Sequence, residues 1–503
     1  MGTSYQEKTK AFLAIAPQFQ LGHLVTESFH PETKMLSYLV KEDVGEALRL
    51  LQAIDRMALI EMKNKEEMLW ELSQDIQDTL NKGNKVFMVG CGATGRLSLV
   101  LETLYRQEYG HTDQVVSFMA GGDFALIKSV ESFEDRTEYG ERQLMELGFG
   151  PNDLLLAPTE GGETPFVIGA TNKAASYSSR APYFLYCNPD GTLKNIQRSQ
   201  EVIENPKIKK VNLAVGPMAI SGSTRMQAST VLMLAIGVGL LYEHKDRASF
   251  KKFYHDFLNR LTLTEYSAME EFTKLEAKLY QEKKYLNYIT DPHLGISILT
   301  DTTERSPTFS LRGFENKLDP EGERSLSYLF IPSAQNAQEG WSELLWREPR
   351  ALTWPDLDRK ISLKEIYGFD ISEAGLKERS KAVSTVDFEV FYEEGDVTFK
   401  CGKEELLFSW GEEPLFNHLM VKMLLNAHST LIMGLLDRYE GNVMTWVRSS
   451  NNKLVDRAAR YVLQLLKMKG KTPSYEDVVE KIFEESENLK ENEPIVIKVM
   501  NRF

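Results

Sequence analysis

The chain has 503 residues, with 59 Lys and Arg against 73 Asp and Glu, and therefore a formal net charge of −14. This length predicts two or three domains, because domains usually run to roughly 100–200 residues, and a hydrophobic fraction of 42% is enough to fill their cores. The chain is acidic and contains no long run of Lys and Arg. This argues against binding to nucleic acid or to anionic membranes, since both require clustered positive charge.

The cysteines and the apolar runs indicate a cytoplasmic protein. Cys91, Cys187 and Cys401 lie too far apart for a metal or redox motif, and an odd number is a poor disulfide framework. The N-terminal residues show no apolar core of a signal peptide. The longest apolar run, Val231 to Tyr242, falls short of the roughly 20 residues that a membrane span needs, and it predicts a buried helix. The histidines show no metal spacing, so we expect neither a metal nor an organic cofactor.

After a helical N-terminal segment, predicted for residues 1–55, the sequence indicates a parallel α/β domain over residues 56–245. Short apolar runs alternate there with longer helical patterns. The runs are continuous, as is typical of strands that are covered on both faces. They comprise residues 86–89, 115–119, 153–157, 183–186 and 211–215. We therefore predict one doubly wound parallel sheet of five strands.

The second half of the chain repeats this pattern. Residues 246–285 are charged and helical, and predict connecting helices. Strand-like runs resume within residues 286–440, which predicts a second doubly wound parallel-sheet domain. These runs comprise residues 288–289, 327–331, 386–392 and 405–409, followed by an apolar helical pattern over 415–436. The last segment, 441–503, is predicted to be helical with a charged, solvated tail.

Three polar glycine turns follow predicted strands of the first domain. They are Gly90 to Arg96, Thr159 to Pro165 and Ser221 to Arg225. Glycines let backbone N–H groups approach an anion, and the N-terminus of the next helix adds partial positive charge. A tight structural turn explains any one of them equally well. Three turns beyond the carboxyl ends of strands in one sheet, however, would converge on a ligand crevice.

These segments resemble the sugar isomerase (SIS) family. Gly90 to Arg96 is similar to its G-x-G-x-S/T-G-R motif, and Ala120 to Asp123 to its A-G-G turn. Ser129 to Asp135 resembles V-E-G-x-E-D, and Gly216 to Met226 resembles a signature ending in G-S-T-R. The resemblance is greatest to the group that contains N-acetylmuramic acid 6-phosphate etherases and glucokinase regulatory protein, and it extends to residues 21–28 and 452–458. It implies an α/β fold with two SIS domains in one chain, an internal pseudo-dimer.

The resemblance also implies one retained site made from both domains. The etherase motif has a catalytic acid after the first glycine loop, where this chain has Leu104. Residues 294–309 match the acid segment instead and place Glu304 at the acid position, while the second domain's own glycine loop has decayed to residues 289–293. Glu134 would then be the base and Glu304 the acid on one ligand. The alternatives are a surface carboxylate for Glu304 and a first-turn helix residue for Glu134.

The ligand's phosphate would be held by hydroxyls, backbone N–H groups and two cations. The predicted set consists of Gly92, Thr94, Gly95, Thr159, Gly161, Gly162, Ser221, Ser223, Arg225 and Lys453. Any of these hydroxyls could instead cap a helix, above all Ser221. Glu160 and Glu163 depart from the family pattern in the second loop, and Gln227 stands where the family usually has Lys.

The sequence therefore predicts a protein that binds a hexose or hexosamine 6-phosphate between two SIS domains and cleaves the lactyl ether of N-acetylmuramic acid 6-phosphate. Two alternatives stay open. One is a non-catalytic sensor that controls a partner such as a sugar kinase, and the other is an aldose–ketose isomerase, which needs the same base. A duplicated domain fits a monomer, and a homodimer remains open.

Overall fold

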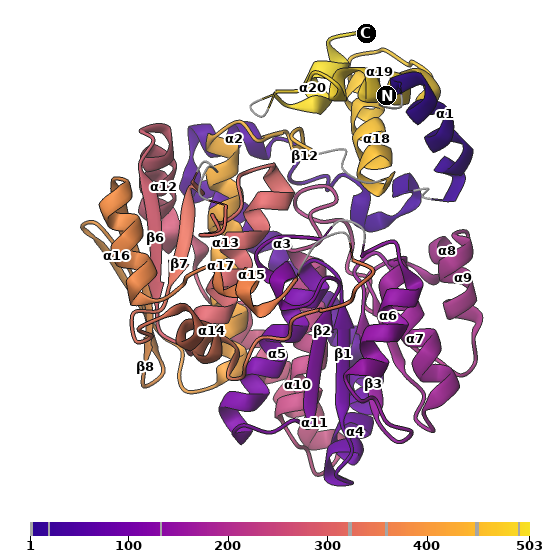
Figure 1. Ribbon diagram of the computed structural model, residues 1–503, viewed down its shortest axis with the longest axis vertical. Helices are drawn as coiled ribbons and strands as arrows, with labels where there is room; N and C mark the ends of the chain where they lie inside the picture. The colour runs from indigo at the N-terminus through magenta and orange to yellow at the C-terminus, as the bar shows by residue number, and fades with distance from the viewer. Residues whose placement is uncertain are drawn as a thin grey trace.

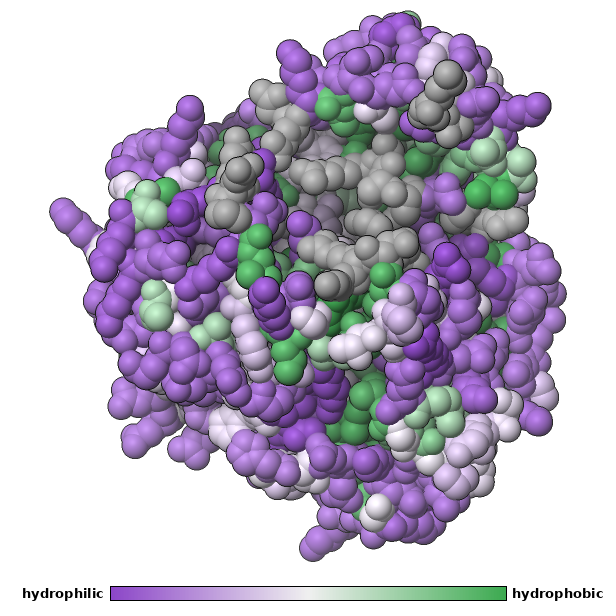
Figure 2. All heavy atoms as spheres, in the orientation of Figure 1, coloured by the Kyte–Doolittle hydropathy of each residue, from purple (hydrophilic) through white to green (hydrophobic). Residues whose placement is uncertain are grey.

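The computed structural model describes residues 4–18, 21–130, 133–319, 324–357, 361–447, 452–490 and 493–503. Two sheets lie side by side, each flanked by helices, and both chain ends come together above them (Figure 1). The face drawn in Figure 2 is mainly hydrophilic, with hydrophobic side chains in small groups, as the acidic composition suggests. Among the described helices, none combines the length and the apolar character that crossing a bilayer requires.

The first sheet confirms the predicted parallel architecture. Its order is β2-β1-β3-β4-β5, and all its strands run parallel. The strands are β1 (Val86–Gly90), β2 (Val115–Met119), β3 (Leu154–Pro158), β4 (Tyr183–Tyr186) and β5 (Lys209–Asn212). The first four are buried along their whole length, which explains their continuous apolar runs. The chain order reverses around β1, and a crevice is expected beyond the carboxyl ends of β1 and β3.

Helices cover both faces of this sheet, and together with it they form what we call the first unit, β1–β5 with α4–α10. The helices are α4 (Glu66–Asn81), α5 (Ala93–Tyr109), η5 (Asp123–Leu126), α6 (Thr137–Glu146), α7 (Pro165–Tyr177), α8 (Asp190–Leu193), α9 (Gln197–Glu204) and α10 (Gln227–Leu241). Every residue of α10 is buried, so the longest apolar run forms a core helix as predicted.

The second sheet is mixed, and this corrects the prediction of a second all-parallel sheet. Its order is β10-β9-β8-β6-β7, in which β7, β6 and β8 are parallel while β8, β9 and β10 form antiparallel hairpins. The strands are β6 (Tyr285–Thr290), β7 (Ser327–Phe330), β8 (Thr385–Glu393), β9 (Asp396–Cys401) and β10 (Glu404–Ser409). Glu394 and Gly395 both have positive φ, at 47° and 89°, which suits a two-residue hairpin turn. The alternation of half-buried and exposed residues along β10 marks a solvated edge.

The helices of the second half pack between the two sheets and around the second one, and β6–β10 with α12–α17 form what we call the second unit. The helices are α11 (Arg247–Leu261), η6 (Tyr266–Met269), α12 (Glu270–Gln281), α13 (Gly295–Phe309), α14 (Ala337–Leu345), α15 (Leu363–Tyr367), α16 (Glu373–Ala382) and α17 (Pro414–Leu435). Helix α17 is buried from Leu415 to Gly434 and contacts α10 of the first unit, and α13 contacts α5. These contacts make the interface between the units.

The two chain ends form a shared helical layer. Helix α1 packs against α19, where the rings of Phe12 and Phe483 lie 6.0 Å apart, and α18 contacts η2. The elements are α1 (Tyr5–Ile15), η1 (Ala16–Gln18), η2 (Leu21–His23), η3 (Val25–Glu27), β11 (Tyr439–Glu440), β12 (Val443–Met444), α18 (Asn452–Met468), α19 (Tyr475–Ser486) and α20 (Ile495–Met500). Two further helices of the N-terminal part contact α17 instead, namely α2 (Leu36–Glu42) and α3 (Val44–Met62). The short helix η4 (Lys63–Lys65) follows α3. The domain limits drawn from the sequence stay predictions, and α3 continues through residue 55.

Candidate functional site

A cavity of about 240 Å³ lies where the loops after β1 and β3 meet α13 and α18. Seven of the predicted site residues line it, namely Gly92, Glu134, Gly161, Ser223, Arg225, Glu304 and Lys453. Glu134 belongs to the first unit, Glu304 to α13 of the second unit, and Lys453 to α18 near the C-terminus. The two predicted catalytic carboxylates therefore face one cavity, although they come from different units.

The first glycine loop combines close packing with an open turn. A Cβ on Gly90 would lie 2.3 Å from the backbone nitrogen of Gly95, and one on Gly95 would lie 2.5 Å from Cβ of Met119. These two glycines let β1, α5 and β2 approach one another. Gly92 has φ 56° and faces open space, and it directly precedes the N-terminus of α5. The partial positive charge of that helix end is thereby presented to the cavity.

Several hydroxyls predicted to bind phosphate are bonded within the fold. Thr94 Oγ1 accepts a hydrogen bond from the Cys91 backbone nitrogen at 3.0 Å, and Thr159 Oγ1 donates to Thr164 Oγ1 at 3.2 Å. Ser221 Oγ donates to the Glu27 carbonyl oxygen at 2.6 Å. Among the described residues, the cavity lining does not include these three or the predicted Gly95 and Gly162. None of these three hydroxyls caps a helix as the alternative predicted, but each is engaged in a hydrogen bond inside the fold.

Lys453 is the cation at the centre of the polar wall. Its Nζ lies 3.2 Å from Oε1 of Glu134 and 2.8 Å from Oε1 of Glu163. Burial opposes the charge of this ammonium, but Glu134 and Glu163 raise the pKa of Lys453 above its ordinary value. Burial also opposes ionisation of Glu163, which is 2% exposed, yet Lys453 and Arg198 outweigh it and lower the pKa of Glu163 to about 2. Lys453 and Glu163 are thus a fully charged pair near neutral pH.

Glu304 has the opposite environment. It is 7% exposed, lies on α13 and faces the cavity. Burial raises the pKa of Glu304 above its ordinary value, against the charges of Arg96 and Arg225 nearby. Such an environment favours the protonated form, which is the form that a general acid needs.

Glu160 adds a further carboxyl group to the cavity. Its Oε1 accepts a hydrogen bond from Ser229 Oγ at 3.1 Å. Burial, together with the charge of Glu304, raises the pKa of Glu160 to about 7. Glu160 therefore changes its charge close to neutral pH, whereas Glu163 in the same loop stays ionised.

Comparison with known proteins identifies the family. The model of the glucokinase regulatory protein N-terminal SIS domain matches residues 69–175. N-acetylmuramic acid 6-phosphate etherase of Mesorhizobium japonicum is 30% identical over 223 residues, which cover 44% of this chain and 67% of that enzyme. The enzyme of the same name from Rhodopirellula baltica is 30% identical over 224 residues, covering 44% of this chain and 68% of its own. This chain belongs to the SIS family. It falls in the group of these etherases and the regulatory protein.

A solved structure of tagatose-6-phosphate ketose/aldose isomerase from Escherichia coli is also similar, at 10% sequence identity and a TM-score of 0.49. The similarity covers 79% of this SIS protein and 94% of the isomerase.

Glu27 and Arg457 are among the cavity residues of this SIS protein that were not predicted. Arg457 donates to both carboxylate oxygens of Glu27, with its Nε at 2.9 Å and its Nη2 at 2.5 Å, and both residues line the cavity. A Cβ on Gly222 would lie 2.6 Å from Oε2 of Glu27, so only glycine leaves room for this pair. The signal was present in the sequence, because Glu27 and Arg457 lie in the two terminal segments that resemble the etherases.

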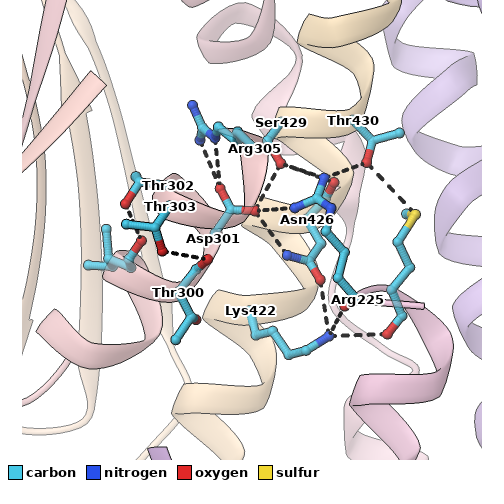
Figure 3. A network of polar contacts seen from close by, with 12 residues as sticks. Arg225, Thr300, Asp301, Thr302, Thr303, Arg305, Lys422, Asn426, Ser429 and Thr430 are labelled. Atoms are coloured by element: carbon cyan, nitrogen blue, oxygen red, sulfur yellow. Dashed lines mark hydrogen bonds and ion pairs between the residues drawn. The ribbon is translucent and has the colours of Figure 1, made fainter. Parts of the chain in front are cut away.

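Arg225 borders the cavity but is engaged elsewhere. It is 3% exposed, and its Nη1 donates to Asp301 Oδ1 at 3.0 Å while its Nη2 donates to Ser429 and Thr430 (Figure 3). The guanidinium therefore ties the third glycine loop to α13 and α17, and the expected phosphate contact has to compete with these bonds. Within the described parts of the chain, no group of three or more His, Cys, Asp or Glu is arranged for a metal ion.

Proposed function

We propose that the cavity binds a sugar phosphate and that the protein acts on it as a carbon–oxygen lyase of the etherase type. The observation that carries this proposal is that Glu134 and Glu304 line one cavity of about 240 Å³. Related proteins named N-acetylmuramic acid 6-phosphate etherase support this reaction and suggest N-acetylmuramic acid 6-phosphate as the substrate.

The chemistry requires one base and one acid. In the open-chain form of the sugar, the aldehyde makes the C2 proton acidic, and Glu134 would remove it. The electron pair then expels the ether oxygen from C3, and Glu304 would protonate that oxygen as lactate leaves. Addition of water at C3 reverses both proton transfers and regenerates the two side chains. A correctly placed acid or base typically contributes about 10²–10⁴-fold to the rate.

The phosphate would bind at the glycine loops. The N-terminus of α5 at Gly92, the loop at Gly161 and the side chain of Ser223 all face the cavity. The ammonium of Lys453 adds the charge that a phosphate dianion requires. This arrangement would leave the sugar between Glu134 and Glu304, and it would place the positive end of a helix where the negative charge of the ligand is greatest.

A sugar-phosphate sensor is the second candidate, and one observation favours it. Glu134, the proposed base, already shares the ammonium of Lys453 with Glu163. The ion pair occupies the carboxylate that would have to accept the C2 proton, so this arrangement suits binding without turnover. The match of residues 69–175 to a domain of glucokinase regulatory protein points the same way, with a sugar kinase as the partner.

Lactate release separates the two candidates. The pure protein is incubated with N-acetylmuramic acid 6-phosphate, alongside Glu134→Gln, Glu304→Gln and the control Glu138→Gln on the exposed side of α6. The lyase proposal expects lactate from the wild type and the control, and about a 10²–10⁴-fold slower release from the other two variants.

Each of the other outcomes points to a different function of the cavity or to none. Binding of the sugar phosphate in calorimetry without lactate identifies a sensor. Deuterium uptake from solvent at C2 without lactate indicates isomerase-type proton transfer. Absence of any binding overturns the sugar-phosphate site itself.

A further inference from the structure

Asp301 lies one helical turn before Glu304 on α13 and is 1% exposed. Its carboxylate accepts five hydrogen bonds, and Figure 3 shows the donors pointing at it from three sides. Oδ1 accepts from Arg225 Nη1 at 3.0 Å, Asn426 Nδ2 at 2.9 Å and Ser429 Oγ at 2.9 Å. Oδ2 accepts from Arg305 Nε at 3.0 Å and Nη2 at 2.8 Å. Nothing in the proposed reaction uses this residue directly.

The five donors come from three parts of the chain. Arg225 belongs to the third glycine loop of the first unit, Asn426 and Ser429 to α17, and Arg305 to the next turn of α13 itself. Arg305 is fixed in turn by Glu276 and by the hydroxyl of Tyr288. One carboxylate thus joins the two units directly behind the cavity, and the position of the α13 turn that bears Glu304 depends on it.

The charges around Glu304 show why this contact matters for an acid. Three cations face Glu304: Arg96 on α5, Arg225, and Lys422 on α17. All three favour the ionised carboxylate. Two carboxyl groups act in the opposite sense, Asp301 on the same helix and Glu160 in the second glycine loop.

The cations differ in how they are compensated. Arg96 donates to the carbonyl oxygens of Ala125 and Leu126, and Lys422 donates to the backbone oxygens of Arg225 and Met226. These hydrogen-bond partners are neutral, although the charges of Asp55 and Asp301 also act on Lys422. Arg225, by contrast, has a full negative charge at 3.0 Å on Asp301. Asp301 is therefore the group that decides how strongly Arg225 acts on Glu304.

We propose that Asp301 is the positioning residue of the site: it retains Arg225 at the interface between the units and fixes the turn of α13 so that Glu304 faces the cavity. The description of Glu304 as an acid rests on the proposed function, whereas the effect of Asp301 on its protonation does not. Burial opposes the charge of Asp301 itself, but Arg305 and Arg225 outweigh it and lower the pKa of Asp301. The Asp301 carboxylate therefore stays ionised throughout the pH range in which Glu304 titrates.

The test measures protonation of Glu304 and does not need turnover. The infrared band of the protonated Glu304 carboxyl group, assigned by its loss in Glu304→Gln, is titrated with pH in the full chain. In Asp301→Asn, Arg225 loses its counter-charge, and the midpoint is expected to fall by about one pH unit or more, a tenfold change in the proton equilibrium. The double variant Asp301→Asn/Arg225→Gln removes the released charge as well and should restore the midpoint. A merely structural role would not produce that rescue.

Two results would overturn the proposal: an unchanged midpoint in a folded Asp301→Asn variant, or a lowered midpoint that the double variant does not restore. If Asp301→Asn does not fold, Arg225→Gln alone tests the proposal. It removes a cation that pairs with Asp301, and it should raise the midpoint of the Glu304 titration. An unchanged midpoint there counts against the proposal. In an active protein, Asp301→Asn should also move the alkaline limb of the kcat profile to lower pH with little change in KM. Absence of lactate release from the wild type would contradict the lyase function alone, since the titration still reports on Asp301.

Discussion

Lys453 lies 3.2 Å from Glu134, although 319 residues separate the two in the chain. The same ammonium is 2.8 Å from Glu163, so one side chain of α18 closes the cavity over two carboxylates of the first unit. Helix α18 therefore adds a cation to the positive charge that the glycine loops already present, which comes from the N-terminus of α5 and from Arg96 and Arg225 in the cavity lining.

Replacement of Lys453 by Met should weaken binding of N-acetylmuramic acid 6-phosphate. The loss of one charge-assisted hydrogen bond costs about 1.5–3 kcal/mol, which corresponds to roughly 10–100-fold in Kd. Isothermal titration calorimetry measures the change. Lys467→Met, at an exposed position of the same helix, is the matched control and should bind as the wild type does. Equal affinities of the two variants would remove Lys453 from the site.

Glu160 should make the stability of the wild type depend on pH. Burial and the charge of Glu304 raise its pKa to about 7, so the folded state holds this proton more tightly than the unfolded chain does. The resulting stabilisation is complete below about pH 4.5 and is lost as the pH rises through 7, a change on the order of 3 kcal/mol.

Glu160→Gln removes this dependence. Urea denaturation at pH 5 and pH 8 should show a smaller loss of unfolding free energy in this variant than in the wild type. Glu201→Gln, at an exposed position of α9, should retain the loss seen in the wild type. The same slope in all three proteins would show that Glu160 does not titrate in this range.

Glu102 is a buried anchor between the units. It accepts hydrogen bonds from Arg347 at 3.1 Å and from Arg350 at 2.8 Å, and both arginines belong to the segment that follows α14. Glu102→Gln removes the negative charge and leaves these cations undercompensated, which should lower the unfolding free energy by about 3–5 kcal/mol.

Urea denaturation at pH 7 checks the effect, with the exposed Glu108→Gln on the same helix as the control. Burial opposes ionisation of Glu102, but Arg347 and Arg350 outweigh it and hold its pKa well below the ordinary value. The difference between wild type and Glu102→Gln should therefore be complete above about pH 4.5 and shrink as the pH falls further. Coincident denaturation curves for the two variants would contradict the anchoring role.

Gly90→Ala should disturb the end of β1. The added Cβ would stand 2.3 Å from the backbone nitrogen of Gly95, and backbone cannot yield as a flexible side chain does. We expect a loss of about 1–3 kcal/mol in stability, seen as a lower Tm, together with weaker ligand binding. Gly191→Ala has no atom within 4 Å of the added Cβ and should change neither quantity. A native Tm for Gly90→Ala would mean that α5 can move away at little cost.

The buried strands of the first sheet were predictable because both their faces are covered, and so each left an unbroken apolar run. Glu134 and Glu304 were found through the segments around them, and the cavity brings them together. Residues 386–392 and 405–409 were predicted as strands, but β9 between them and the antiparallel pairing of β8 to β10 were missed, because the half-buried alternation along β9 gives a weaker signal than a continuous apolar run. Their turn at Glu394 and Gly395 was the available indication.

The cavity lining includes a smaller share of the residues expected to bind phosphate than of the expected catalytic carboxylates. A hydroxyl at a loop–helix junction looks the same in a sequence whether it bonds to backbone, as Thr94 does, or to a ligand. Glu27 and Arg457 could not be assigned to the cavity from their spacing, because only the packing of both chain ends beside the first unit brings them there. Arg225 was recognised as a cation, but its partner Asp301 belongs to the other unit.

The shared helical layer of the two chain ends (Figure 1) has a consequence for how the molecule would come apart. Opening of this layer separates α1 from α19, which also contacts α18. Helix α18 carries Lys453 and Arg457, so opening of the layer at α18 would remove these cations from the cavity without unfolding either sheet. We expect an empty protein to be degraded faster than one holding its ligand, because the ligand would bind this layer to the first unit.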